Sequence, residues 1–242
     1  MSSPDSEVKV LSQLVCLALF LMQSAPLAVY RLADGFSATA NPNGPWQIGF
    51  SASPSLASDQ FRLAQYADIS EPIVLWHPAK PQGNGPGYYP YVGFNPTRQT
   101  RTTSANGWAL RPGAAAMEGS NDGAYSIVRF AAPVTAYYKV TAQFAGIHYR
   151  LSTTDVHVLH NDARLFDGEI DGYGGDTMFH AMEGSHPVAS WFGTVRMNAG
   201  DTISFAVGYG PNHTHYNDTT ELIAEVQRMT ENTNHPSTKS GR

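Results

Sequence analysis

The chain has 242 residues, of which 42% are hydrophobic and 14% charged, and its formal net charge is −5 at pH 7. This balance excludes the basic surface that nucleic-acid phosphates require, so we expect no nucleic-acid partner. The length suits one large domain better than two. The 22 glycines and 16 prolines are typical of a loop-rich β protein.

Residues 1–28 have the features of an export signal. Lys9 precedes an apolar run at 14–22, and small residues such as Ala25 and Ala28 follow it. The run is too short to span a bilayer, which takes roughly 20 residues. A buried amphipathic N-terminal helix is the alternative interpretation. We predict a signal peptide over 1–28, and hence a secreted protein, extracellular or periplasmic, with no membrane anchor after signal removal.

Two further features concern the mature chain. Cys16, the one cysteine of the sequence, lies in the predicted signal, so the mature protein would have neither a thiol nor a disulfide. Its stability would then depend on core burial, with or without a bound metal ion, and not on covalent cross-links. Residues 229–242 are polar and predict a disordered tail, which leaves a single domain over 29–228.

The N-terminal half of this domain is predicted to alternate short strands with loops. A first strand is expected over 30–37, and Trp46 restarts a two-residue apolar period as a core residue. Further strands are expected over 61–66 and 73–76. Eleven of the 16 prolines lie in 26–112. Because proline cannot donate to a central ladder, loops and edge strands should dominate this half.

The C-terminal half has the clearest strand pattern. Every second residue is apolar in several runs, which are separated by turn residues such as those at 198–201. No crossover helix interrupts the runs, so the strands should pair antiparallel. The predicted fold class is all-β, an antiparallel β-sandwich with long Pro/Gly-rich loops. The alternating apolar positions include Tyr138, Val140, Ala142 and Phe144, then Val156 and Val158, then Ile203, Phe205 and Val207, and finally Leu222, Ala224 and Val226.

Short motifs also follow one another in a defined order along residues 30–227. They include Asp34-Gly35-Phe36-Ser37, Asn41-Pro42-Asn43-Gly44, Val128-Arg129-Phe130-Ala131, Phe144-Ala145-Gly146, Asp155-Val156-His157-Val158, Gly200-Asp201-Thr202-Ile203 and Asp218-Thr219-Thr220. Together they resemble a family of secreted bacterial jelly-roll domains of the carbohydrate-binding-module type, often found in surface-sorted exported proteins.

This resemblance implies a jelly-roll sandwich that binds a polysaccharide or another glycan. The chain departs from the family pattern at Arg111, where a histidine is expected, and in an insertion-like segment over 171–190. The C-terminal sorting helix of many relatives is also missing, which predicts a freely secreted product.

Six aromatic residues in or beside loops are the predicted carbohydrate contacts. A flat ring can stack on the apolar face of a sugar while neighbouring polar groups bond the sugar hydroxyls. The alternative is that these rings fill the sandwich core, where tryptophans are mostly found. The six residues are Tyr88, Tyr89, Tyr91, Trp108, Tyr173 and Trp191.

Three groups of residues are candidates for metal binding. The resemblance implies a structural Ca²⁺ where the first and last strands meet, with Asp34 and Asp218 as its carboxylates; Asp218 could instead be a turn or cap residue. The acidic, glycine-rich stretch 167–176 offers hard oxygen ligands suited to calcium, although such runs are commonly just solvated. The two histidines within 213–215 and Glu221 resemble a cupin metal motif, but with a different spacing.

The sequence contains no nucleophile elbow, HExxH motif or phosphate loop. A lyase could still use Tyr173 with His180 or His186 and Arg196, and a glycosidase needs only two carboxylates across a cleft. We predict a non-catalytic, carbohydrate-binding protein that uses loop aromatics. The alternatives are a jelly-roll polysaccharide lyase or glycosidase, and a structural extracellular matrix or surface protein without a small ligand.

Overall fold

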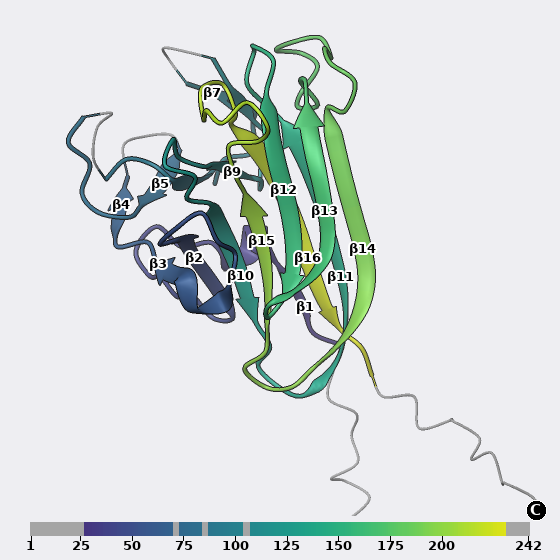
Figure 1. Ribbon diagram of the computed structural model, residues 1–242. Coiled ribbons are helices and arrows are strands. Elements are labelled where there is room, and N and C mark those ends of the chain that lie inside the picture. Colours follow the sequence, from purple (N-terminus) through teal and green to yellow (C-terminus); the bar gives the residue numbers. More distant parts are fainter. Residues whose placement is uncertain (1–26, 70–72, 84–86, 104–106, 231–242) are drawn as a thin grey trace, which may run out of the picture.

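The computed structural model describes residues 27–69, 73–83, 87–103 and 107–230 (Figure 1). Nearly all of the predicted signal peptide and most of the predicted tail lie outside these residues. The described part is built from strands, together with a one-turn helix α2 (Leu32–Gly35) and a 3₁₀ turn η1 (Ser58–Gln60). Across these ranges, no helix has the length and apolar character needed to cross a membrane.

The larger sheet has the strand order β14-β11-β16-β9-β6-β5-β4, and β1 pairs with β16 away from this path. All of these pairs are antiparallel. The strands are β1 (Val29–Arg31), β4 (Tyr66–Asp68), β5 (Val74–His77), β6 (Tyr91–Phe94), β9 (Ala115–Glu118), β11 (Ala136–Gly146), β14 (Val188–Met197) and β16 (Thr220–Arg228).

The second sheet has the order β13-β12-β15-β10-β2-β3 and is also antiparallel. Figure 1 shows it lying over the larger sheet, and from β10 to β16 the chain alternates between the two layers except at the β12–β13 hairpin, as in a jelly roll. The prediction of an all-β antiparallel sandwich is confirmed. The strands are β2 (Trp46–Ser51), β3 (Phe61–Leu63), β10 (Ser126–Ala131), β12 (Thr153–His160), β13 (Ala163–Asp171) and β15 (Thr202–Val207), and a separate pair is formed by β7 (Arg101–Thr102) and β8 (Ala109–Leu110).

The core lies between the two sheets and follows the two-residue apolar period. Tyr138, Val140 and Phe144 on β11 are fully buried, whereas Lys139 and Gln143 on the same strand are exposed. Trp46, as predicted, is a core residue: its ring meets Phe130 edge-on, with the ring centroids 5.4 Å apart. Edge-on aromatic contacts of this kind add to the free energy of area burial.

The predicted strand over 30–37 is wrong beyond Arg31. The chain turns into α2 there, which places the Leu32 side chain in the core. Gly35 then packs directly on the Trp46 ring, and a Cβ at this position would overlap the indole. The close approach of backbone to a core ring therefore outweighs the local apolar alternation.

The predicted strand over 61–66 is two strands that belong to different sheets. The backbone N–H of Ala64 still donates to Ile48 of β2, whereas the N–H of Gln65 donates to His77 of β5. The chain therefore crosses from one layer to the other between adjacent residues. The segment expected over 73–76 is confirmed as β5.

Burial on the two faces predicts different effects of removing two phenylalanine rings. Phe205 on β15 is fully buried between the sheets, whereas Phe192 on β14 is 80% exposed. We expect Phe205→Ala to lower the free energy of unfolding by about 3–5 kcal/mol, because it removes buried contacts and leaves a cavity. Phe192→Ala should change it by less than about 0.5 kcal/mol. Urea unfolding of both variants tests this, and equal losses would contradict the observed orientation of the strands.

Candidate functional site

The antiparallel order of the larger sheet gathers three loops at one edge. In an antiparallel sheet, the end of one strand lies beside the start of its neighbour. Tyr91, at the start of β6, is paired with Glu118, at the end of β9, and Met117 is paired with Thr220, at the start of β16. The loops before β6, after β9 and before β16 therefore meet at this edge, although they are far apart in sequence.

A cleft of about 470 Å³ opens among these loops. Its volume lies within the ~300–1,000 Å³ that is usual for small-molecule sites. One loop contributes a tyrosine, the second a run of three polar residues, and the third a histidine and a tyrosine. The lining residues are Tyr89, Ser120, Asn121, Asp122, His215 and Tyr216.

One wall of the cleft is a row of three aromatic rings. The ring centroids of Tyr89 and His215 are 4.0 Å apart, and those of His215 and Tyr216 are 4.7 Å apart with the planes stacked at 29°. Tyr216 is 66% exposed, while His215 between the two tyrosines is 5% exposed. The outermost ring is therefore available to a ligand and is supported from behind by a buried one.

The other wall is polar and is tied to the first by hydrogen bonds. Asn121 Oδ1 accepts the backbone N–H of His215 at 3.1 Å, which links the loop after β9 to the loop before β16. Asp122 Oδ1 accepts the Ser120 hydroxyl and the N–H of Ala124. Asp122 Oδ2 and the Asn121 NH₂ make no hydrogen bond within the described ranges, so both remain for a ligand.

A buried carboxylate, Glu118, holds the floor of the cleft. It accepts hydrogen bonds from the hydroxyls of Tyr91, at 2.7 Å, and Thr219, at 2.6 Å. It also accepts one from Nδ1 of His215, at 3.1 Å, because a carboxylate can only accept from this ring nitrogen. The Glu118 carboxylate thus fixes the orientation of the His215 ring.

The electrostatics of the floor keep the nearby tyrosines protonated. Burial, and then the negative charge of Glu118, raise the pKa of Tyr89 well above the usual value for a phenol. The same causes raise the pKa of Tyr91. At neutral pH both side chains are therefore neutral phenols.

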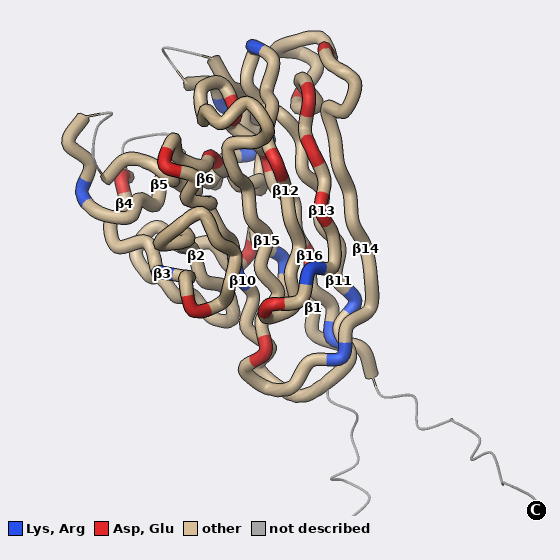
Figure 2. Tube along the Cα trace, in the orientation of Figure 1, with Lys and Arg blue, Asp and Glu red and all other residues tan. Residues whose placement is uncertain are grey.

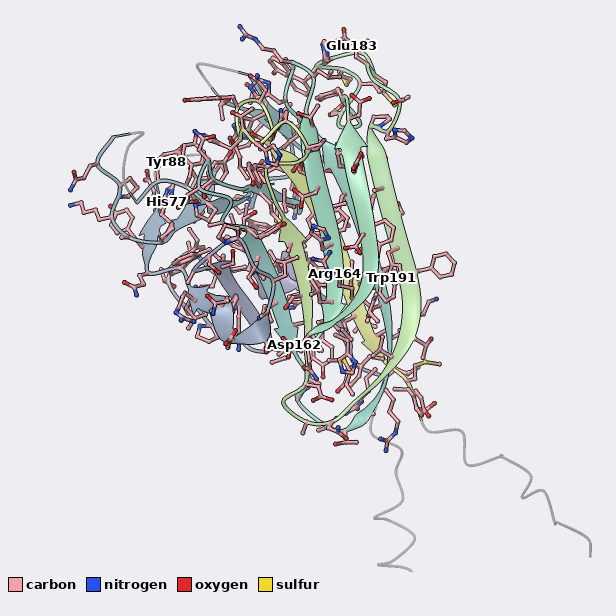
Figure 3. The ribbon with its side chains drawn as sticks, in the orientation of Figure 1. His77, Tyr88, Asp162, Arg164, Glu183 and Trp191 are labelled. Carbon is pink, nitrogen blue, oxygen red and sulfur yellow. The ribbon has the colours of Figure 1, made fainter. Side chains whose placement is uncertain are left out.

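His77 anchors the loop that carries Tyr88 and Tyr89. Its Nδ1 donates to the Tyr88 carbonyl at 2.8 Å, and the Tyr88 ring packs on the imidazole with centroids 4.7 Å apart. Figure 3 shows the two residues side by side. His77 is fully buried, its Nε2 has no hydrogen-bond partner, and burial lowers its pKa. The loop is therefore held by a neutral, buried imidazole.

Of the six aromatic residues predicted to contact carbohydrate, Tyr89 lines the cleft and the other five lie elsewhere. Tyr91 and Tyr173 are 3% and 1% exposed, so neither ring can stack on a ligand at the surface. Tyr88 is half-buried behind Tyr89. Trp108 packs on a small second core, and Trp191 packs on the main core from β14, where Figure 3 shows it at the edge of the sandwich.

Sequence reasoning missed most of the cleft. In the sequence His215 is a candidate metal ligand only, and the pattern assigns no role to Tyr216 or the 120–122 turn. A signal was present, because 209–217 is a glycine- and asparagine-containing loop with two tyrosines and two histidines between two clear strands. Nothing in the sequence placed that loop beside Tyr89.

The structure does not bring the two proposed calcium ligands together. Asp34 is exposed and lies 3.8 Å from Arg31, whose register partner is Glu225 on β16. Asp218 lies just before the start of β16, seven residues from Glu225, and is fully buried. Among the described residues, no three histidine, cysteine or acidic side chains are grouped so that they could hold a metal ion. The pair therefore does not fit a shared Ca²⁺.

The acidic stretch 167–176 also has local partners. Figure 2 shows acidic residues along β13, where Asp167 accepts from His157 and Arg164 at 2.5 and 2.6 Å. Asp171 accepts from Ser185, and Asp176 from Thr100. These three aspartates are bound to different groups, so the stretch is not a single ion site.

The cupin-like motif and the residues considered for a lyase do not form complete sites either. Glu221 is paired with Arg111, whereas His215 is bound to Glu118, so the cupin-like grouping does not form. The buried Tyr173 donates to the Asp176 carbonyl, and Arg196 lies at the end of β14 away from the loop with His180. Tyr173 and His180 do meet edge-on, with ring centroids 5.2 Å apart, but the Tyr173 hydroxyl is already bonded and Arg196 is not beside them, so the full lyase group does not form.

Comparisons with known proteins give similarity to solved structures at low TM-scores. No family model and no curated protein matches the chain, so the family resemblance stays a prediction. A family 35 carbohydrate-binding module from Clostridium thermocellum is 14% identical over 52% of this chain and 85% of that chain, with a TM-score of 0.30. A CBM4 structure is 9% identical, covering 53% and 74%, with a TM-score of 0.25. The C-terminal CBM6 of a marine laminarinase from Zobellia galactanivorans is 12% identical, covering 54% and 87%, with a TM-score of 0.25. At such TM-scores the likeness does not decide what this chain binds.

Asp218, on the loop before β16, gives a pH-dependent prediction. Its Oδ1 accepts the N–H of Thr153 at 2.9 Å, its Oδ2 is buried without a partner, and burial raises its pKa from 3.8 to about 8. Between these two values the folded protein holds a proton that the unfolded chain has lost, so this residue makes the protein less stable as pH rises. Asn cannot lose a proton in this way. The free energy of unfolding of Asp218→Asn minus that of the wild type should therefore increase by about 1.4 kcal/mol for each pH unit between these two pKa values.

Urea unfolding at several pH values between 4 and 8 measures this difference. Asp59→Asn, at an exposed position in η1, is the matched control. Its free energy of unfolding should vary with pH in the same way as that of the wild type. A difference between Asp218→Asn and wild type that does not vary with pH would show that Asp218 is ionised in the folded protein.

Proposed function

We propose that this chain is a secreted, non-catalytic protein that binds carbohydrate in the cleft between the loops before β6, after β9 and before β16. The observation that carries the proposal is the pairing of two unlike walls. Aromatic rings stand on one side, and free amide and carboxylate groups on the other. A pyranose has the same division, because its C–H face is apolar and its hydroxyls form hydrogen bonds.

The arrangement of carboxylates favours binding over hydrolysis. A typical glycosidase places two carboxyl groups on either side of the scissile bond. Here Asp122 lines the cleft, while Glu118 is buried beneath it and already accepts three hydrogen bonds. Glu118 is therefore a support for the aromatic wall and not a group that can reach a glycosidic oxygen.

Secretion enters the proposal from the sequence. The predicted signal over 1–28 would export the chain, and an exported binding protein would meet its glycan outside the cell. Culture fractionation with N-terminal sequencing of the released protein tests this part independently of binding.

The cleft predicts that a single exposed ring is needed for binding. Tyr216→Ala should weaken glycan affinity about 3- to 10-fold, because stacking on one aromatic ring contributes about 0.5–1.5 kcal/mol. Tyr137→Ala is the matched control, since Tyr137 is also exposed but lies on β11 at the end away from Thr220. Isothermal titration with a panel of soluble oligosaccharides measures both.

Reducing-sugar assays in the same samples detect any turnover. Sugar release abolished by Asp122→Asn would replace the binding proposal with an enzymatic one. If no glycan of the panel binds, or if the Tyr137 variant loses as much affinity as the Tyr216 variant, the cleft is not the carbohydrate site.

A further inference from the structure

The charge of the cleft is one-sided. Its exposed lining contains the Asp122 carboxylate, the Glu118 carboxylate lies directly beneath it, and no lysine or arginine is among its lining residues. Burial, and then the negative charge of Glu118, raise the pKa values of Tyr88 and Tyr89. The chain as a whole carries 20 acidic residues against 15 basic ones. The cleft and the surrounding protein therefore favour a cation.

The aromatic wall favours the same kind of ligand. The face of a tyrosine ring attracts a nearby cation through its quadrupole, and the attraction grows when the ring is shielded from water. Tyr89 and Tyr216 lie on either side of the His215 ring in the row, and Asp122 belongs to the same cleft. Rings and a free carboxylate oxygen at one site are the two groups that bind an ammonium ion best.

We propose that the cleft selects a glycan of amino sugars with free, protonated amines over the corresponding neutral glycan and over acidic glycans. This inference rests on the proposed carbohydrate-binding function and specifies its ligand class. The ammonium group contacts Asp122 Oδ2 and the Tyr216 face, while the adjoining sugar ring stacks along Tyr89 and Tyr216. The Asn121 amide donates to a hydroxyl of the same residue.

Neutral and acidic sugars each lack the positive charge that this cleft favours. An N-acetylated amine has no charge, so it leaves Asp122 without a counter-ion. A uronate brings a second carboxylate close to Asp122 and Glu118, and the lining offers no guanidinium or ammonium to pair with it. The selectivity therefore follows from the sign of the charge and not from the shape of the sugar.

A matched pair of ligands isolates this charge. The β-1,4-linked glucosamine hexamer and its fully N-acetylated counterpart have the same backbone and length. We expect calorimetry in mildly acidic buffer to show at least ~10-fold tighter binding of the free amine form, with added salt reducing the difference. An oligogalacturonate of similar length should bind more weakly than either.

Two variants locate the effect. Asp122→Asn keeps the oxygen that accepts from Ser120 and Ala124 and removes only the charge, so it should lower affinity for the free amine form much more than affinity for the N-acetylated hexamer. Glu169→Gln, at an exposed position on β13, removes one charge elsewhere and should change neither. Thermal melts of both variants confirm folding. If Asp122→Asn does not fold, Tyr216→Ala provides the second test, because it should lower affinity for the free amine more than for the N-acetylated form.

The outcomes separate the two proposals. Binding of the N-acetylated hexamer, or of a neutral glucan, as tight as that of the free amine form would overturn the charge selectivity and keep carbohydrate binding. Equal losses of affinity for the free amine hexamer in Asp122→Asn and Glu169→Gln would show that the hexamer is attracted to the acidic protein as a whole. That result would remove the assigned site. No binding of any glycan would overturn both proposals.

Discussion

Three buried carboxyl groups, at the start of β16 and at the adjoining end of β9, hold together the end of the sandwich that carries the cleft. Glu118, Asp218 and Glu221 are each 5% exposed or less. An unpaired charge in this environment would be costly, so each group must be neutralised or bonded. Glu221 is bound to the guanidinium and backbone N–H of Arg111, Glu118 accepts three hydrogen bonds, and burial raises the pKa of Asp218 to about 8.

The bonds of these carboxyl groups join loops that are distant in the chain. Glu118 connects β9 to Tyr91 of β6 and to His215, so the position of the aromatic wall is determined by a buried polar network and not by the loop itself. Asp218 fixes the same loop against β12 through the N–H of Thr153. A ligand would therefore meet rings whose orientations are already set, which lowers the entropic cost of binding. The same network makes the floor electronegative, which links the architecture of the cleft to the sign of the charge that it prefers.

The position of an aromatic residue in the sequence was a poor guide to its exposure. Tyr91 follows a glycine-rich segment, which suggests a solvated loop, yet it is the first residue of β6 and its hydroxyl is satisfied by Glu118. Tyr173 follows Gly172, whose positive φ and contact with the Glu183 carbonyl fold the 172–187 segment back on itself and bury the ring. Conversely, Tyr216 is exposed and stacks on its buried neighbour, His215.

The sequence by itself determined the antiparallel sandwich and much of its core, because a strand with one buried face must alternate apolar and polar residues, as β11 does. It also determined that Trp46 is a core residue. Only the tertiary structure decided which loops meet, which rings face solvent, and that Asp34 is exposed beside Arg31 whereas Asp218 is buried just before β16. Those facts follow from the order and register of strands separated by tens of residues, and from the burial of Glu118 and Asp218. Local periodicity carries no information about pairing between such distant segments, so the cleft emerges only when β6, β9 and β16 lie side by side.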